Sequence, residues 1–168
     1  HPDLSMLLTT GTLTSARLAA QRLPERTLHQ FIPVDVPQYV AAFLDHWRPD
    51  LAIFTESEIW PNLILATSER KIPLTLINAR MSPRSMKRWR KYARLGRPLF
   101  SRFALILAQN DRVARVLRFL GAPHVVTTGN LKIDAPAPPV DAAQLAALKE
   151  AIGARHVWLA ASTHAGEE

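Results

Sequence analysis

Two carboxylates stand close to a tryptophan and an asparagine in residues 56–62, Glu-Ser-Glu-Ile-Trp-Pro-Asn, directly after a short apolar run. Glu56 or Glu58 could supply an acid or a base, Trp60 a surface on which a sugar ring stacks, and Asn62 a hydrogen-bonding amide. The alternative is that one glutamate caps the helix that follows and that Trp60 packs in the core. The residues alone leave both interpretations open.

Two further polar clusters also follow apolar runs, Asn78-Ala79-Arg80 and Gly129-Asn130-Leu131-Lys132. Taken singly, each is compatible with an ordinary turn that carries solvated charges. In a parallel sheet, however, the carboxyl ends of the strands meet at one edge, where ligands bind. Three such clusters along the chain therefore predict that their side chains converge on one site.

The positive charge of the chain is concentrated in one segment. The net charge is +7 at pH 7 and the sequence pI is about 10.5. No acidic residue lies between Glu69 and Asp111, and Trp89 and Tyr92 stand among the cations there. Such a segment suits an anionic membrane surface or RNA, and a merely solvated helix is the third interpretation. The cations of the segment are Arg70, Lys71, Arg80, Arg84, Lys87, Arg88, Arg90, Lys91, Arg94, Arg97 and Arg102.

Several classes of site are excluded or poorly supported. The chain has no cysteine, which excludes disulfides and thiolate metal sites. His164 beside Glu167 and Glu168 is weak evidence for a metal, and no P-loop or spaced GxGxxG pattern occurs. The chain begins His-Pro-Asp without an initiator methionine, a signal-peptide pattern or a long apolar span, so we expect a fragment of a longer protein.

Short apolar runs alternate with amphipathic stretches along the chain, which predicts an α/β fold with a Rossmann-like parallel sheet flanked by helices. We expect helices on both faces of that sheet. The predicted strands are 4–9, 29–34, 51–54, 73–77, 104–108, 124–128 and 157–161, and the predicted helices are 13–23, 39–47, one from about 61, 82–93, 112–120 and 142–152.

A proline-rich stretch divides the sequence. Residues 134–141 hold three prolines, which favours an extended connector. We therefore expect one domain over residues 1–133 and the opening of a second over residues 142–168, where a strand and a small-residue turn end the chain without the helix that should follow.

Five blocks together resemble the family of bacterial 3-deoxy-D-manno-octulosonic acid (Kdo) transferases, over nearly the whole chain. The resemblance implies the two-Rossmann-domain, type-B glycosyltransferase architecture, with the acceptor domain first and lacking here its first strand and helix. It also implies an inverting transfer of Kdo from CMP-Kdo to a phosphorylated lipid A precursor, with no metal or cofactor. The blocks are ESEIWPN (56–62), INARMSPRS (77–85), AQN (108–110), GNLK (129–132) and ASTHAGEE (161–168).

The expected setting is the cytoplasmic face of the bacterial inner membrane, with the full-length protein peripheral or anchored at its N-terminus. By the same resemblance, Glu56 and Lys132 support the transition state, and the general base is a glutamate of an SxGE motif that is absent here, so the fragment alone is expected to be inactive. A basic nucleic-acid-binding module is the rival interpretation, although the resemblance implies no nucleic-acid partner. The expected acceptor-binding residues are Glu58, Trp60, Asn62, Arg80, Arg84, Lys87, Arg88 and Arg90, and the donor-binding ones are Ser162, His164 and Glu167.

Overall fold

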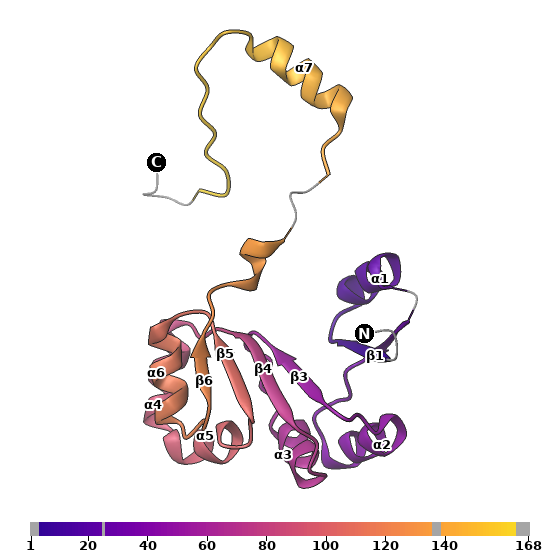
Figure 1. Cartoon of the computed structure of the whole chain (residues 1–168), viewed down its shortest axis with the longest axis vertical. Helices are drawn as coiled ribbons and strands as arrows, with labels where there is room; N and C mark the ends of the chain where they lie inside the picture. The colour runs from indigo at the N-terminus through magenta and orange to yellow at the C-terminus, as the bar shows by residue number, and fades with distance from the viewer. Residues whose placement is uncertain (1–3, 25, 136–138, 164–168) are drawn as a thin grey trace. The chain divides into compact units, whose positions relative to one another are not determined.

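The computed structural model describes residues 4–24, 26–135 and 139–163. The chain divides into two compact units, His1–Ile133 and Asp134–Glu168 (Figure 1). The first unit contains two parallel sheets and the helices that connect their strands. This unit contains the site described below. Its parallel strands and flanking helices confirm the predicted α/β class.

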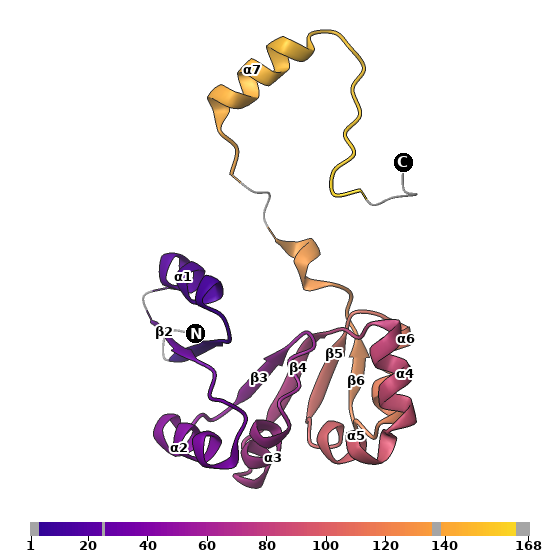
Figure 2. The ribbon, with the colours of Figure 1, turned by 180° about the vertical axis from the view of Figure 1, so that it is seen from behind.

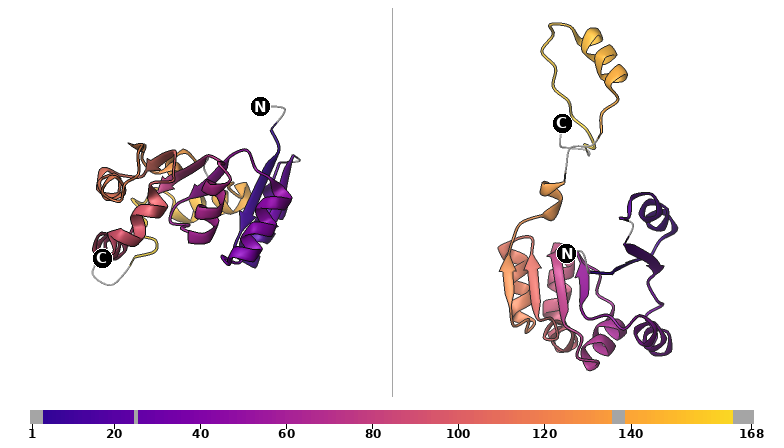
Figure 3. Two further views of the ribbon diagram at one scale, coloured as in Figure 1. Left: turned by 90° about the horizontal axis from the view of Figure 1, so that it is seen from below. Right: turned by 45° about the vertical axis from the view of Figure 1, so that its right-hand side comes forward.

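The first sheet has two strands, β1 (Met6–Thr10) and β2 (Thr27–Phe31), joined by helix α1 (Leu13–Arg22). The strands are parallel, with Met6 opposite Thr27. Helix α1 begins where the polar break of the sequence predicts, because the Thr12 side chain accepts a hydrogen bond of 3.1 Å from the Ser15 amide. Figure 3 shows this pair apart from the other four strands.

The second sheet has four parallel strands in the order β3-β4-β5-β6 (Figure 2). Helix α2 (Pro37–Trp47) precedes this sheet. Each strand is followed by a helix before its neighbour begins, which is the arrangement that parallel pairing requires. The strands are β3 (Ala52–Thr55), β4 (Leu74–Ala79), β5 (Leu105–Ala108) and β6 (Val125–Thr127), and the connecting helices are α3 (Pro61–Glu69), α4 (Pro83–Lys91), α5 (Ala93–Phe100) and α6 (Asp111–Phe119).

The core lies against one face of this sheet. Leu74, Leu76 and Ile106 are buried, whereas Ile53 on β3 is 56% exposed. The expectation of helices on both faces is therefore wrong for the described part of this sheet. Strands added in sequence order in one direction, with right-handed connections, place all the connecting helices on the same face.

Helix α4 confirms the helix expected over residues 82–93, and the basic segment also forms a second helix, α5, that was not expected. Helix α4 ends at Lys91, Tyr92 interrupts it with φ −105° and ψ 39°, and α5 follows at once despite Pro98 inside it. Burial of Leu99 and Phe100 explains why α5 forms against its local propensity. Gly96 permits the packing of the two helices, because a Cβ there would lie 3.0 Å from Cε3 of Trp89.

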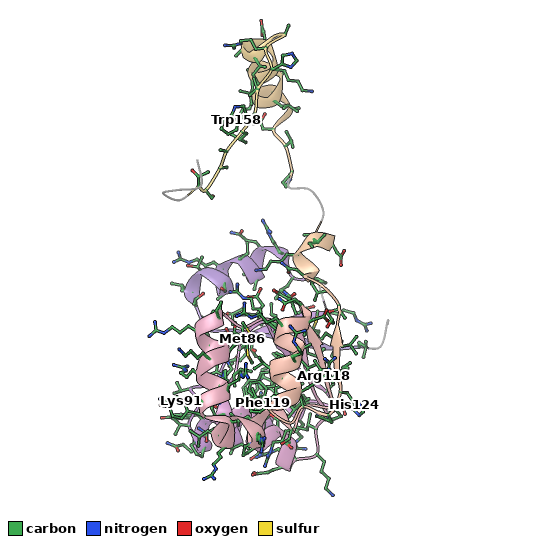
Figure 4. All side chains as sticks on the ribbon, turned by 90° about the vertical axis from the view of Figure 1, so that its left-hand side faces the viewer. Met86, Lys91, Arg118, Phe119, His124 and Trp158 are labelled. Carbon is green, nitrogen blue, oxygen red and sulfur yellow. The ribbon has the colours of Figure 1, made fainter. Side chains whose placement is uncertain are left out.

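The second unit contains helix α7 (Ala142–Ile152), with the bounds expected, and Asp141 accepts hydrogen bonds from the amides of Ala143 and Gln144. The strand expected over 157–161 is wrong, because the structure assigns no strand there. A strand needs a hydrogen-bonding neighbour, and within the described part of this unit no other strand occurs. Trp158, labelled in Figure 4, is 85% exposed.

Candidate functional site

Side chains from three strand ends meet at the C-terminal edge of the four-stranded sheet. Glu56 follows β3, Arg80 follows β4, and Lys132 lies in the 3-10 helix η1 (Leu131–Asp134) after β6. The Glu56 Oε1 atom is 2.8 Å from Nζ of Lys132, and Oε2 is 3.0 Å from Nε of Arg80. We call these three residues the Glu56 triad. The predicted convergence of the polar clusters is confirmed, while the roles of the residues stay predictions.

The backbone at Glu56 is turned to direct its side chain across the sheet edge. Its φ of 53° lies in the left-handed region, which costs a non-glycine residue about 1 kcal/mol. Two backbone hydrogen bonds hold this conformation: the Glu56 amide donates to the Ile77 carbonyl at 3.0 Å, and the Arg80 amide donates to the Glu56 carbonyl at 3.3 Å. The surrounding β4 segment therefore fixes an unfavourable conformation, as is typical of functional sites.

A buried asparagine fixes the segment that carries Lys132. Asn78, 5% exposed, also has a left-handed backbone, with φ 52°. Its Oδ1 atom accepts hydrogen bonds from Nε2 of Gln109 at 2.9 Å and from the amide of Leu131 at 3.2 Å. Asn78 thus connects the ends of β4 and β5 to the residue immediately before Lys132. Gln109 was not among the expected site residues, although its position directly after β5 was a signal for it.

The surroundings of Glu56 favour the charged form of its carboxylate. The hydrogen bond from Lys132 is the largest influence and, with the Arg80 guanidinium, holds the pKa of Glu56 below its usual range, although partial burial acts in the opposite direction. A carboxylate with a lowered pKa is a weak proton acceptor. Glu56 is accordingly suited to orienting two cations and less suited to acting as a general base.

Next to the triad lies a pocket of about 180 Å3, which we call the Glu56 pocket. Its polar lining comes from Glu56 and Arg80 on the sheet edge and from the α4 residues Ser85 and Arg88. Trp89 forms part of its apolar side and is held by an edge-to-face contact with Phe100, at 5.3 Å between ring centroids. The complete lining is Glu56, Ser57, Ile59, Ala79, Arg80, Met81, Ser85, Arg88 and Trp89.

Three residues expected to bind the acceptor contact other protein groups instead of lining this pocket. The Trp60 indole donates to Glu58 Oε2 at 2.9 Å, and Trp60 packs against the core. The Asn62 side chain donates to the Asp35 carbonyl at 2.7 Å. Acceptor binding by these residues stays a prediction.

Helix α3 is capped by a residue distant in the sequence. The Asp35 carboxylate accepts from the amides of Asn62 at 3.1 Å and Leu63 at 2.8 Å. The alternative that Glu56 or Glu58 caps this helix is therefore wrong.

The cations of α4 divide between two hollows. Arg88 lines the Glu56 pocket, whereas Lys87 and Arg90 line a groove of about 510 Å3 between α4 and α6. Figure 4 shows Met86 and Phe119 between these two helices. Arg84 is exposed and lines neither hollow. The groove, called here the α4–α6 groove, is lined by Pro83, Met86, Lys87, Arg90, Arg112, Arg115, Val116 and Phe119.

The expected donor-binding residues lie in the second unit or outside the described residues. Ser162 is exposed, with a left-handed φ of 58°. His164 and Glu167 lie outside the described residues. Their proposed contacts with the donor stay predictions.

Residues 1–135 match the family model described as 3-deoxy-D-manno-octulosonic-acid transferase (kdotransferase). The chain belongs to the Kdo transferase family. Relatives within this family are a probable mitochondrial 3-deoxy-D-manno-octulosonic acid transferase of Arabidopsis thaliana, 39% identical over 99% of this chain, and the 3-deoxy-D-manno-octulosonic acid transferases of Rickettsia felis, 34% identical over 100%, and Haemophilus influenzae, 33% identical over 100%. This chain spans 39%, 36% and 40% of those relatives, respectively.

No helix in the described part of this Kdo transferase chain has the length and apolar character needed to cross a membrane.

The first prediction concerns Asn78. In the complete protein that carries this chain, Asn78→Ala should lower the free energy of unfolding by about 1–3 kcal/mol, because Gln109 and the Leu131 amide lose their acceptor. Hydrogen exchange of the Leu131 amide should become faster. Gln38→Ala, an exposed substitution on α2, is the control and should change neither quantity. Unchanged exchange at Leu131 would contradict the role assigned to Asn78.

The second prediction concerns the pKa of Glu56. Lys132→Met should raise that pKa toward the usual glutamate value, because the largest stabilising influence on the carboxylate is removed. In the unmodified protein the ion pairs contribute stability above the usual glutamate pKa, and this contribution is lost as the pH falls through the lowered pKa. NMR titration of the Glu56 carboxyl carbon measures the shift. Lys87→Met is the control, and an equal rise in both variants would contradict the assignment.

Proposed function

We propose that the complete protein is an inverting glycosyltransferase that moves Kdo from CMP-Kdo to a phosphorylated lipid A precursor in lipopolysaccharide synthesis. Membership of the Kdo transferase family supports this proposal. The single observation that carries it is the Glu56 triad, a carboxylate between two cations at the C-terminal edge of a parallel sheet. Ligands of open α/β folds bind at this edge.

The proposed reaction forms one bond and breaks another at the anomeric carbon of the donor. An acceptor hydroxyl attacks this carbon and loses its proton, and CMP leaves with the electron pair of the bond to its phosphate oxygen. Lys132 and Arg80 would stabilise the negative charge that develops on the departing phosphate. Glu56 would hold both cations in place, and the lowered pKa of Glu56 supports a proton acceptor elsewhere in the complete protein.

The strand order supports a larger, continuous sheet in the complete protein. Among the described residues, β1 pairs only with β2, and β3 is an edge strand that pairs only with β4. One parallel strand between β1 and β3 would join the two sheets into one of seven strands, and six consecutive strands of it would follow the 3-2-1-4-5-6 order of doubly wound dinucleotide-binding folds. We infer that residues 1–133 are an acceptor domain lacking its first strand and helix, that 134–141 form a linker, and that 142–168 open a donor domain.

The α4–α6 groove supports an anionic membrane surface as a partner. It combines four cations, Lys87, Arg90, Arg112 and Arg115, with the apolar side chains of Met86, Val116 and Phe119, and no acidic residue of the described chain lines it. Phe119 is 46% exposed, whereas Met86 and Val116 are 6% and 7% exposed. Cations around an exposed aromatic side chain are typical of surfaces that bind anionic lipid. The groove would thus hold the protein at the cytoplasmic face of the inner membrane, where the acceptor lies.

The third prediction tests the reaction. In the complete protein, Glu56→Gln should lower turnover about 100-fold or more, because the orientation of Lys132 and Arg80 is lost. The measurement is the mass of the lipid A precursor after incubation with CMP-Kdo, where each transfer adds one Kdo unit. Glu69→Gln, an exposed substitution at the end of α3, should retain normal turnover. Near-normal turnover of the Glu56 variant would remove the triad from the mechanism.

The fourth prediction tests the membrane surface. The double variant Arg90→Glu, Arg112→Glu should bind vesicles containing phosphatidylglycerol at least about tenfold more weakly, because each cation near anionic lipid contributes about 1 kcal/mol. The matched control is Arg84→Glu, Arg94→Glu, which changes the net charge equally and lies outside the groove. Equal weakening by both double variants would mean that net charge alone, and not the groove, binds the vesicles.

A further inference from the structure

The walls of the Glu56 pocket carry more positive than negative charge. Glu56 supplies one carboxylate, and Arg80 and Arg88 supply two guanidinium groups. Lys132 adds another positive charge through its contact with Glu56 Oε1. Arg80 and Lys132 are both paired with Glu56, whereas no ion pair is found for Arg88 among the described residues. The pocket therefore favours a ligand that carries its own negative charge.

Arg88 belongs to a face of α4 that combines a cation, a hydroxyl and an aromatic ring. Ser85, Arg88 and Trp89 are spaced i, i+3 and i+4, so they lie on the same side of the helix and line the pocket together. The contact of Trp89 with Phe100, and the absence of a side chain at Gly96, fix the position of the indole ring. Arg88 can donate two parallel hydrogen bonds to a carboxylate or phosphate.

The pocket is small enough to restrict the ligand. Its volume is about 180 Å3. This space is below the 300–1,000 Å3 that is usual for pockets enclosing drug-sized ligands. The apolar side chains of Ile59, Met81 and Trp89 form one part of the lining and the polar groups form the other. Such a lining suits a sugar ring with an anionic substituent.

We propose that Arg88, with the Ser85 hydroxyl, is an anion subsite that binds the phosphate or carboxylate substituent of the sugar held in the Glu56 pocket. This proposal rests on the proposed function, because the sugar is one of the two transferase substrates. The substituent is either a phosphate of the acceptor or the carboxylate of the Kdo donor, since both have oxygens that a guanidinium binds in pairs. Arg88 would therefore differ in role from Lys87 and Arg90, which lie on the same helix but line the α4–α6 groove.

The experiment compares Arg88→Gln, Arg88→Lys and Lys91→Gln in the complete protein. Lys91 is the matched control, because it lies on the same helix, is exposed and lines neither hollow. Arg88→Gln should raise the KM of one substrate about tenfold or more and change kcat little, since a hydrogen bond to a charged group is lost. Arg88→Lys should recover part of the loss, because a lysine keeps the charge without the paired geometry. Lys91→Gln should alter KM less than twofold.

The source of the anion is distinguished by which KM changes. If the acceptor phosphate is bound, an acceptor without that phosphate should show a raised KM with the unmodified protein and no further rise with Arg88→Gln. If the donor carboxylate is bound, only the KM for CMP-Kdo should rise. The proposal is overturned if Arg88→Gln and Lys91→Gln behave alike, or if Arg88→Gln lowers kcat and leaves both KM values unchanged.

A binding measurement tests the subsite even if the unmodified protein transfers no Kdo. That outcome would contradict the proposed function but not the subsite. Inorganic phosphate, titrated into the 15N-labelled protein, should shift the Trp89 indole and Ser85 amide resonances with saturation. Arg88→Gln should abolish these shifts and Lys91→Gln should retain them. An absence of saturable shifts in the unmodified protein would overturn the subsite.

Discussion

The placement of the Glu56 carboxylate between Arg80 and Lys132 is the interaction on which the geometry of this site depends. Its side chain is 26% exposed, and those of Arg80 and Lys132 are 57% and 69% exposed. Ion pairs this accessible contribute at most about 1 kcal/mol to folding. Their importance is therefore geometric: one carboxylate, held in a left-handed backbone conformation, orients two cations that come from different strand ends.

A buried amide provides the rigidity that the exposed ion pairs lack. Asn78 accepts hydrogen bonds from Gln109 and from the Leu131 amide, which connect the ends of two strands to the segment after a third. Replacing a buried, hydrogen-bonded polar group costs more than replacing an exposed ion, because its partners are left without water. The buried amide thus fixes the backbone segments that carry the site, and the accessible charged groups can contact a substrate.

Helix α4 separates two kinds of anionic surface. Its period of 3.6 residues directs Arg88 into the Glu56 pocket and Lys87 and Arg90 into the α4–α6 groove. Met86, on the same helix, is buried. The absence of acidic residues from this helix, visible in the sequence, thus serves two sites. One is small and next to the triad, and the other is larger, with exposed Phe119 between its cations.

The sequence by itself determined the strands and helices that follow local patterns, and the meeting of Glu56, Arg80 and Lys132, because parallel strands share one C-terminal edge. Five short blocks also sufficed for the resemblance to the family. Only the tertiary structure decided that Asp35 caps α3 and that Asn78 fixes the segment before Lys132, since these contacts join residues far apart in the chain. It also decided the partition of the α4 cations and the absence of a strand over 157–161. Packing against neighbouring elements governs both, and no local pattern of charge or hydropathy contains those neighbours.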